Sequence, residues 1–287
     1  MDKILVIGGG GREHALAQNL SQSKWVDKVY VAPGNGGIFT KDGRIESVSI
    51  QPTWVKQLLD FAKEQKIDLT VVGTEIALAA GVADYFREEG LRIFGPSLHA
   101  ARIETSKIFA KELMKETNIP TARSHVFCNH RELMKYVVSG ECQFPIVIKR
   151  DGLTAGKGVL VCGNAVEAKR FIEKTTGSLL IEDFLDGPEL SIHVLCDGKY
   201  FVLLPLSQDY KTVFENNEGL NTGGMGSYAP VGKADNGVLL AYLRDKIIEP
   251  ALRGMTSKDR STYIGCLYPG LKITPKGIMV LEFNARF

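Results

Sequence analysis

Two lysines and several glycines follow one another closely at the end of an apolar run. Ile146–Val159 reads IVIKRDGLTAGKGV, a predicted strand that ends in Lys149 and continues into a loop. The loop contains Gly152, Gly156, Lys157 and Gly158. Glycines allow backbone N–H groups to approach an oxyanion, and ammonium groups add positive charge. The pattern predicts a flap over a polyphosphate, which we interpret as ATP; the alternative is a solvated hairpin turn without a ligand.

The loop differs from a P-loop, which has four residues between its first glycine and Gly-Lys and then a Ser or Thr hydroxyl for magnesium. Here only residues 153–155 separate Gly152 from Gly156, and Gly158 follows the lysine. The ligands of a magnesium ion must therefore lie elsewhere in the chain.

The segment Leu281–Phe287, which reads LEFNARF, contains suitable ligands. Residues two apart share one face of a strand, so Glu282, Asn284 and Arg286 are expected to face the same side. Carboxylate and amide oxygens are hard ligands for Mg²⁺ or Mn²⁺, and a guanidinium neutralises the charge of a transferring phosphoryl group. The alternative is the solvent face of an edge strand.

A second glycine-rich turn, Gly8–Gly11, lies between a predicted strand at Lys3–Ile7 and a helix that begins at Arg12. It does not match a dinucleotide fingerprint, because Glu13 or His14 stands where the third glycine belongs and no acid follows the next strand. We therefore expect no NAD. The N-terminus of this helix is suited to an anion; the alternative is a turn needed only for close packing.

Alternating strands and helices in the first third of the chain predict a doubly wound parallel sheet, an α/β fold. Ligands of such sheets bind outside the carboxyl ends of the strands. Three segments are expected to converge there: Gly8–Gly11, Pro33–Asn35 and Thr74–Glu75. The predicted strands are 3–7, 29–31, 69–73 and 91–94, and the predicted helices begin at 12 or span 53–66 and 82–89.

The remainder predicts an α+β arrangement that begins with one helix, Ala100–Lys115. A small module follows, with helices 131–139 and 165–174 and strands 146–149, 159–162 and 179–182. The last part predicts strands 190–196, 200–204, 264–271 and 278–283, a loop over 218–226 and a helix over 238–253.

The composition is that of a globular protein, with 44% hydrophobic and 24% charged residues among 287. Because the formal net charge is only +2 and no basic run is interleaved with aromatic residues, we expect no nucleic-acid partner. Five cysteines without a CxxC pair indicate reduced thiols. The chain shows no leader and no apolar run of about 20 residues, so we expect a cytoplasmic protein without a membrane partner.

Together these patterns resemble the ATP-grasp superfamily and, within it, the glycinamide ribonucleotide synthetases. The resemblance covers nearly the whole chain, and its most specific strings are NTGGMG and NARF. The strings that support it are GGGGREHAL from Gly8, APGN from Ala32, IFGPS from Ile93, SKIFAKELM from Ser106, DGLTAGKGV from Asp151, EDFLDG from Glu182, NTGGMGSYAP from Asn221 and LEFNARF from Leu281.

The resemblance implies an N-terminal pre-ATP-grasp domain over 1–101 and an ATP-grasp domain over 102–287, with a lid over about 121–187 and a central part over 188–287. ATP would lie between the lid and the central part. The implied phosphate-binding residues are Lys107, Lys149, Gly156, Lys157 and Gly158. The implied adenine hinge and ribose acid are Glu182, Asp183, Phe184, Leu185 and Glu189.

On the substrate side, the resemblance implies binding residues from several loops. They are Gly10, Gly11, Asn35, Glu75, Asp209, Lys211, Asn221, Thr222, Gly223, Gly224, Met225 and Gly226. Glu282 and Asn284 would bind Mg²⁺ or Mn²⁺. The implied catalytic residues are Lys149, Asn221 and Arg286.

The implied reaction transfers the γ-phosphoryl group of ATP to the carboxylate of glycine. The amine of 5-phosphoribosylamine then attacks glycyl phosphate, giving glycinamide ribonucleotide, ADP and phosphate. Positioning and charge neutralisation dominate such chemistry. A monomer or weak dimer is expected, and His14 and His193 are expected to be buried or capping residues without an acid–base role.

Several positions depart from the family pattern: Thr74-Glu75-Ile76-Ala77, Tyr210, Thr212 and Leu220. The family also continues beyond NARF, so we expect a fragment that retains ATP binding. Two alternatives therefore stay open: an ATP-grasp ligase with another carboxylate and amine, and a nucleotide-binding chain without turnover.

Overall fold

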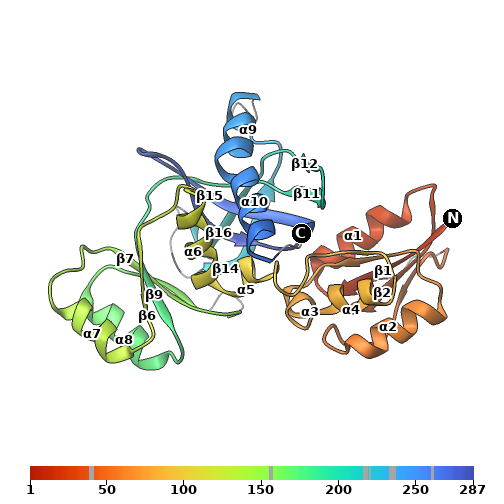
Figure 1. Ribbon diagram of the computed structural model, residues 1–287, viewed down its shortest axis with the longest axis horizontal. Coiled ribbons are helices and arrows are strands. Elements are labelled where there is room, and N and C mark those ends of the chain that lie inside the picture. Colours follow the sequence, from red (N-terminus) through yellow and green to blue (C-terminus); the bar gives the residue numbers. More distant parts are fainter. Residues whose placement is uncertain (39–41, 155–157, 216–218, 220, 233–236, 260–261) are drawn as a thin grey trace.

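The computed structural model describes residues 1–38, 42–154, 158–215, 219, 221–232, 237–259 and 262–287. Figure 1 shows three groups of elements: a sheet with helices near the N-terminus, a small sheet covered by α7 and α8, and a body between them that contains β15, β16 and α10. The C-terminus lies on the side of the body that faces the N-terminal sheet (Figure 1), where the rings of Phe287 and Phe94 are 5.7 Å apart.

The N-terminal sheet has five parallel strands in the order β3-β2-β1-β4-β5. Its strands are β1 (Asp2–Gly8), β2 (Val26–Pro33), β3 (Ile45–Ser47), β4 (Leu69–Val72) and β5 (Ile93–Phe94). The order reverses at β1, as in a doubly wound fold. The predicted parallel sheet is therefore confirmed, with β3 as a strand that the sequence did not predict.

Helices cover both faces of this sheet, since β1 is apolar on both sides. Ile4 and Val6 belong to a buried cluster with Ala17 of α1, whereas Leu5 and Ile7 belong to a second cluster on the opposite face. In Figure 1, α1 lies on one side of the strands and α2, α3 and α4 lie on the other. The helices are α1 (Gly11–Ser21), α2 (Val55–Glu64), α3 (Glu75–Ala79) and α4 (Val82–Glu88).

The predicted helix Ala100–Lys115 is two helices, α5 (Arg102–Thr105) and α6 (Lys107–Glu116), so that prediction was wrong. Ser106 separates them with extended backbone angles of φ −136° and ψ 112°. Its hydroxyl accepts a hydrogen bond from Phe109 N at 3.1 Å. Serine stabilises a helix N-terminus in this way, and the cap starts a new helix.

The small sheet is antiparallel in the order β6-β9-β7-β8. Its apolar face packs on two helices through a cluster that includes Leu133, Ile148, Ile172 and Leu179. The elements are β6 (Ser124–Phe127), α7 (His130–Val138), β7 (Ile146–Arg150), β8 (Val159–Cys162), α8 (Ala165–Lys174) and β9 (Leu179–Asp183). Apart from β6, the sequence predicted these elements to within one residue at each end.

The central sheet is antiparallel, with β15 at its middle and β10, β11 and β16 paired to it. Its core continues into the cluster on one face of the N-terminal sheet, because Val280 and Phe283 of β16 belong to the same cluster as Leu5 and Ile7. The elements are β10 (Glu189–Ser191), β11 (Val194–Asp197), β12 (Phe201–Leu203), β15 (Ile264–Thr274) and β16 (Gly277–Asn284). Helices α9 (Gly237–Leu243) and α10 (Glu249–Asp259) join through a π-helical turn, Arg244–Ile248.

The predicted strand 190–196 is interrupted, which corrects the expectation of one continuous strand. Ser191 is paired with Gly270 and Val194 with Leu267, so the two halves keep one register along β15. Pro269 lies opposite the interruption and has no N–H to donate to the ladder. The missing donor explains why β10 and β11 are separate strands.

The loop predicted over 218–226 was wrong for residues 221–226, because β13 (Gln208–Thr212) and β14 (Asn221–Tyr228) form a two-stranded antiparallel ribbon. Residues 218 and 220 of that prediction lie outside the described part of the chain. The strand predicted to contain Arg286 ends at Asn284, so Arg286 lies beyond it. Within the described part of the chain, no helix has both the length and the apolar character needed to cross a membrane.

Candidate active site

A buried carboxylate, Glu182 at the end of β9, lies between two lysines. Its Oε2 is 3.0 Å from Lys111 Nζ and its Oε1 is 3.0 Å from Lys149 Nζ. The exposed fractions of these three side chains are only 3%, 6% and 8%, respectively. Burial lowers the pKa of Lys111 and Glu182 opposes that shift. A buried charge is tolerated where it is paired in this way.

Lys149 has a second contact, because its Nζ donates to Leu281 O at 3.1 Å. An ammonium has three N–H donors, so one donor remains for a ligand. The carboxylate of Glu182 is occupied by the lysines, which leaves the backbone of the predicted adenine hinge as its ligand-binding part. Asp183 forms an exposed ion pair with Arg123 at 2.7 Å, and Phe184 is 39% exposed.

The start of the predicted flap is bound to the N-terminus of α6. Asp151 accepts hydrogen bonds from Ser106 Oγ at 3.2 Å and from Ile108 N at 3.2 Å. Lys107 Nζ donates to Gly152 O at 2.9 Å. At Gly158, a Cβ atom would overlap the side chain of Thr154. The predicted ligands Gly156 and Lys157 lie outside the described residues.

Replacing Ser106 by alanine should lower the free energy of unfolding by about 1 kcal/mol, because α6 loses its N-cap. Asp151 also loses one of its donors, so the flap base should become more accessible to a protease. Urea unfolding and limited proteolysis would measure these effects. Ser139→Ala is a control, because that hydroxyl lies at the C-terminus of α7, where it donates to Tyr136 O and accepts from Glu141 N, and caps no helix N-terminus. Equal effects of both variants would contradict the capping role of Ser106.

The predicted metal ligands Glu282 and Asn284 both lie on β16. Asn284 donates from Nδ2 to Tyr268 O at 3.4 Å and accepts at Oδ1 from Arg286 Nη2 at 3.4 Å. One carboxylate and one amide oxygen fit Mg²⁺, which takes few protein ligands and completes its shell with water and phosphate. Among described residues there is no cluster of three or more His, Cys, Asp and Glu that could bind a metal, so these two ligands would depend on the nucleotide.

Glu282 is close to two lysines from different elements. Burial lowers the pKa of Lys107, and Glu282 is the leading charge that opposes this shift. Burial would also lower the pKa of Lys211, yet Glu189, Glu282 and Asp209 together raise it above its usual value. The charge of Glu282 therefore acts on cations of both α6 and β13.

Arg286 is bound to two carboxylates. Its Nε is 2.9 Å from Glu75 Oε2 and 2.9 Å from Glu104 Oε1. Glu104 Oε2 accepts a hydrogen bond from Ala285 N at 2.6 Å. The structure thus brings the predicted residues Glu75 and Arg286 together, although Glu75 starts α3 in the N-terminal part. The sequence did not single out Glu104. The one sequence feature near it is the Ser106 cap, two residues later.

The first glycine turn is organised by Glu13, which the sequence did not predict as a site residue. Glu13 is 2% exposed and its Oε2 accepts from Gly10 N at 2.6 Å. A Cβ at Gly8 would lie 2.6 Å from Glu13, and one at Gly73 would overlap the same side chain. Arg12 Nη1 donates to Gly73 O at 2.8 Å. The glycines therefore permit close packing, as the alternative reading of this turn proposed.

Asn35, a predicted substrate ligand, joins two of the converging loops. Its Nδ2 donates to Gly9 O at 3.0 Å and its Oδ1 accepts from Gly37 N at 2.9 Å. A Cβ at Gly11 would meet nothing within 4 Å. The N-terminus of α1 is therefore open at Gly11, whereas the side chain of Asn35 is already hydrogen-bonded to the neighbouring loops.

The predicted ribose acid Glu189 belongs to a charged cluster at the start of β10. Its two oxygens are each 3.3 Å from a lysine, Lys211 and Lys272. Burial would raise the pKa of Glu189, and these two lysines lower it overall. Asp209 lies 3.7 Å from Lys211. The predicted residues Glu189, Asp209 and Lys211 are thus brought together.

His193 and Tyr268 form a ring pair beside this cluster, with centroids 4.4 Å apart. Tyr268 Oη lies 2.9 Å from Ser191 Oγ, which contacts Asp209 at 3.4 Å. Burial lowers the pKa of His193, followed by the charges of Arg12 and Arg286. The pKa of His193 is therefore below its usual value, and the charges that act on it belong to both charged clusters.

The backbone of the predicted substrate segment 221–226 forms β14. Thr222 Oγ1 donates to Lys211 O at 2.8 Å and accepts from Gly224 N at 3.1 Å. Met225 is 60% exposed, and Gly226 pairs with Tyr210 across the ribbon. The segment therefore presents Gly224, Met225 and Gly226 to solvent, with Thr222 bonded to the backbone of Lys211.

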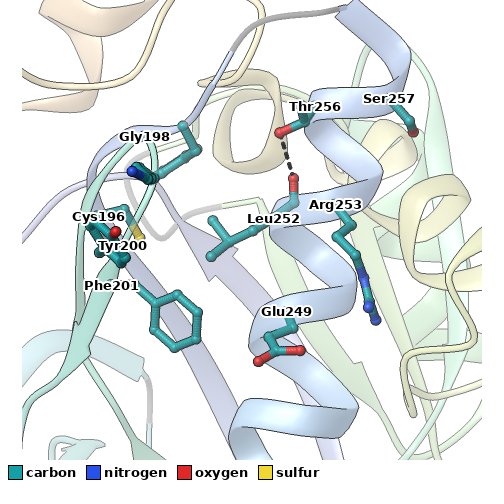
Figure 2. A pocket seen from close by; sticks show the side chains of 11 residues that line it. Cys196, Gly198, Tyr200, Phe201, Glu249, Leu252, Arg253, Thr256 and Ser257 are labelled. Carbon is teal, nitrogen blue, oxygen red and sulfur yellow. Dashed lines mark hydrogen bonds between the residues drawn. The ribbon is translucent and has the colours of Figure 1, made fainter.

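A cavity of about 430 Å³ lies away from all the predicted site residues. It is formed by the turn between β11 and β12 and by α10, and Figure 2 shows Leu252 extending from the helix toward Tyr200 and Phe201. The hydroxyl of Thr256 is already bonded to Leu252 O at 3.0 Å. Its charged lining residues are Lys199, Glu249 and Arg253, and none of the residues predicted to bind nucleotide, metal or substrate lines it.

Two family models match the chain. They are the phosphoribosylglycinamide synthetase N domain over residues 2–104 and the ATP-grasp (A) domain of the same synthetase over residues 105–287. Together they cover nearly every residue that the sequence resemblance covered.

Curated relatives agree with these matches. The phosphoribosylamine–glycine ligase of Caldanaerobacter subterraneus is 43% identical over an alignment of 295 residues including gaps. The alignment covers 99% of this chain and 69% of the relative. That of Streptococcus suis is 46% identical over 294 residues, with the same coverage of 99% and 69%. The chain thus spans about two thirds of the length of these relatives.

Solved structures share the fold. The crystal structure of phosphoribosylamine–glycine ligase from Thermotoga maritima has a TM-score of 0.80 and 30% identity, covering 99% of this chain and 69% of that one. Carboxyaminoimidazole ribonucleotide synthase from Aspergillus clavatus, complexed with ATP, has a TM-score of 0.71 at 19% identity, a likeness of fold alone. With both family models and relatives above 40% identity in agreement, the chain belongs to the phosphoribosylamine–glycine ligases, the ATP-grasp enzymes of purine biosynthesis.

Proposed function

We propose that this chain joins glycine to 5-phosphoribosylamine with ATP and Mg²⁺ or Mn²⁺. The observation that carries the proposal is that cations meet the segment of the proposed metal ligands: Arg286 Nη2 donates to Asn284 Oδ1 at 3.4 Å and Lys149 Nζ donates to Leu281 O at 3.1 Å. The charge of Glu282 also acts on Lys107 and Lys211. These groups combine metal-binding oxygens with fixed cations, which phosphoryl transfer requires. The family membership supports the same reaction.

In the proposed site, Lys107 and Lys149 bind phosphate oxygens, while 182–185 bind adenine and Glu189 binds the ribose. Arg286 faces the γ-phosphoryl group. Glu282 and Asn284 would hold the divalent cation, which would neutralise negative charge of the phosphates. We assign the acceptor side to the remaining predicted residues: Gly10, Gly11, Asn35, Glu75, Asp209, Lys211 and 221–226. The domain division at residue 101 and the lid over 121–187 belong to the same proposal.

The proposed reaction has two steps. An oxygen of the glycine carboxylate attacks the γ-phosphorus, the bond to the β,γ-bridging oxygen breaks, and ADP leaves. The amine of phosphoribosylamine then attacks the acyl carbon of glycyl phosphate, phosphate leaves and the nitrogen loses a proton. The protein orients these groups and excludes water from the acyl phosphate.

The flap geometry fits this sequence of events. Its base is anchored on α6 by Asp151, and Lys107 is bonded to Gly152 O at 2.9 Å. A polyphosphate would compete with that carbonyl for the ammonium. Binding of the nucleotide would therefore be coupled to movement at the start of the flap.

The test is ADP release with MgATP and glycine, with and without phosphoribosylamine formed in place. Release should require both substrates, and Arg286→Ala should slow it by at least about 10³-fold, as loss of an arginine at a transferring phosphoryl group does. Arg253→Ala is the matched control because that arginine lines the distant cavity. ADP release that ignores glycine would refute the assignment, and nucleotide binding without release would leave a binding chain.

We also propose that the protein acts in the cytoplasm on small molecules, as a monomer or weak dimer without nucleic acid or membrane. The five cysteines are free, as in a reducing compartment. The net charge of +2 gives no reason for attraction to polyanions.

A further inference from the structure

Glu104 contacts two adjacent residues with its two oxygens. Oε1 lies 2.9 Å from Arg286 Nε, and Oε2 accepts from Ala285 N at 2.6 Å. The Glu104 side chain is 7% exposed and Ala285 is 1% exposed. One carboxylate on α5 thus forms an ion pair with the guanidinium of Arg286 and accepts a hydrogen bond from the backbone that precedes it.

We propose that Glu104 is a positioning residue that sets where Arg286 meets the transferring phosphoryl group. The inference rests on the proposed phosphate role of Arg286. Glu104 itself would not touch the nucleotide, because both of its oxygens are committed to the terminal segment. Its effect would pass through the guanidinium.

The burial of Glu104 argues against a role as a simple spacer. Burial raises the pKa of Glu104, and the charge of Arg286 and the N–H of Ala285 act in the opposite direction. An apolar side chain would fill the same space without a desolvation cost. The carboxylate is therefore explained by the two groups it binds.

Glu75 is also 2.9 Å from Arg286 Nε, but it differs from Glu104 in its exposure and in its other contacts. Arg286 Nε carries one hydrogen, and neither carboxylate accepts it in a hydrogen bond in the structure. Glu75 is 27% exposed, and among the described contacts it has no second partner comparable to Ala285 N. Glu104 is thus the fixed partner of Arg286, and Glu75 is the partner that a ligand can displace.

The position of Glu104 also links Arg286 to Lys107. Glu104 lies on α5, Ser106 follows as the cap of α6, and Lys107 is the first residue of α6. The charge of Glu104 also acts on Lys107. The short connection from α5 to α6 therefore positions two proposed phosphate-binding cations, Arg286 and Lys107, relative to β16.

The test compares the dissociation constants of Mg-AMP-PNP and MgADP by calorimetry, because their ratio reports contacts to the γ-phosphate. In Glu104→Gln, the preference for AMP-PNP should fall by about tenfold or more, the size expected when a buried charged partner is removed. The affinity for MgADP should change by less than about twofold. Glu75→Gln should reduce the preference less, and Glu89→Gln, which breaks an exposed pair with Lys63, should leave it unchanged.

A full preference in folded Glu104→Gln would overturn the proposal. If that variant does not fold, Glu104→Asp keeps the charge but cannot span both partners, and an unchanged preference there would overturn it equally. If wild-type protein binds both nucleotides equally, the phosphate role of Arg286 fails instead. In that case, the NMR order parameter of Arg286 Nε–H, assigned through Arg286→Lys, tests the positioning. An ordered signal that becomes mobile in Glu104→Gln supports the proposal, and identical order parameters in the wild type and Glu104→Gln refute it.

Discussion

Replacing Glu182 by glutamine should lower the free energy of unfolding by at least about 3 kcal/mol, because removal of one partner leaves buried charges uncompensated. Glu182 lies 3.0 Å from each of Lys111 and Lys149, and all three side chains are under 10% exposed. Without the carboxylate, two ammonium groups would remain close together in a poorly solvated space. Urea unfolding followed by tryptophan fluorescence and circular dichroism would measure the loss.

The charges of Lys111, Lys149 and Glu182 predict which variant should lose the most stability. One carboxylate and two lysines carry a surplus positive charge, consistent with the lowered pKa of Lys111. Lys111→Met should therefore destabilise the protein less than Glu182→Gln, because it leaves the neutral pair of Glu182 and Lys149. Asp183→Asn is the matched control, since its ion pair with Arg123 is exposed. The reverse order of Lys111→Met and Glu182→Gln would show that Glu182 is not the compensating charge.

Much of the fold was predictable from local patterns. The apolar run at the N-terminus and the 3.6-residue periodicity of the helices identified the parallel sheet and the helices of the small module. The errors came from longer-range effects. Pro269 interrupts a strand that it opposes in space, and the ribbon of β13 and β14 forms although β14 contains several glycines, which have low strand propensity.

The types of the candidate site residues were predictable, but their partners were not. At the level of sequence, Lys149 and Arg286 were expected at the phosphates and Lys211 on the substrate side. In the structure each is paired with a carboxylate on another element: Glu182, Glu104 with Glu75, and Glu189, respectively. Pairing compensates the desolvation of buried charges. No local pattern reveals such pairs, because the partners are far apart in the sequence.

Glu13 and Glu104 were missed for a related reason. Each lies in a helix, where a glutamate is ordinary. Glu13 accepts the backbone N–H of Gly10 at the start of its own helix, whereas Glu104 accepts that of Ala285 from a distant segment. Glu13 lies three residues after Gly10, a spacing that permits a glutamate to bond back to the helix start. That spacing was the available signal for Glu13. For Glu104, the partner Ala285 lies at the other end of the chain, and no sequence signal was available.

Replacing Glu282 by alanine should slow ADP release by at least about 100-fold, because a divalent ion contributes several kcal/mol to stabilisation of the transferring phosphoryl group. Glu282 is the charged member of the proposed ligand pair, and Asn284 alone supplies one neutral oxygen. Glu282→Gln keeps an oxygen ligand of similar reach and should show a smaller loss. Measurements at increasing Mg²⁺ or Mn²⁺ concentration would test whether excess metal partly restores the rate.

The second part of this prediction is that metal binding depends on nucleotide, because of the lysines beside Glu282. Lys107 and Lys211 already interact with its carboxylate, so a divalent ion alone must compete with fixed cations and should bind weakly. Once a polyphosphate neutralises Lys107, the carboxylate is freer to bind the metal. Electron paramagnetic resonance should therefore show Mn²⁺ mostly free with protein alone and bound after ADP is added.

The same electrostatics predict opposite effects of Glu282→Ala on nucleotide binding under two conditions. With Mg²⁺ present, the variant should bind ATP more weakly than the wild type, because a metal ligand is lost. In EDTA it should bind ATP at least as tightly, because a negative charge beside Lys107 and Lys211 has been removed. A misfolded variant would lose affinity under both conditions. Equal weakening with and without metal would therefore contradict the assignment of Glu282 as a metal ligand, whereas the change of sign can arise only if the carboxylate repels the nucleotide in one case and holds its cation in the other.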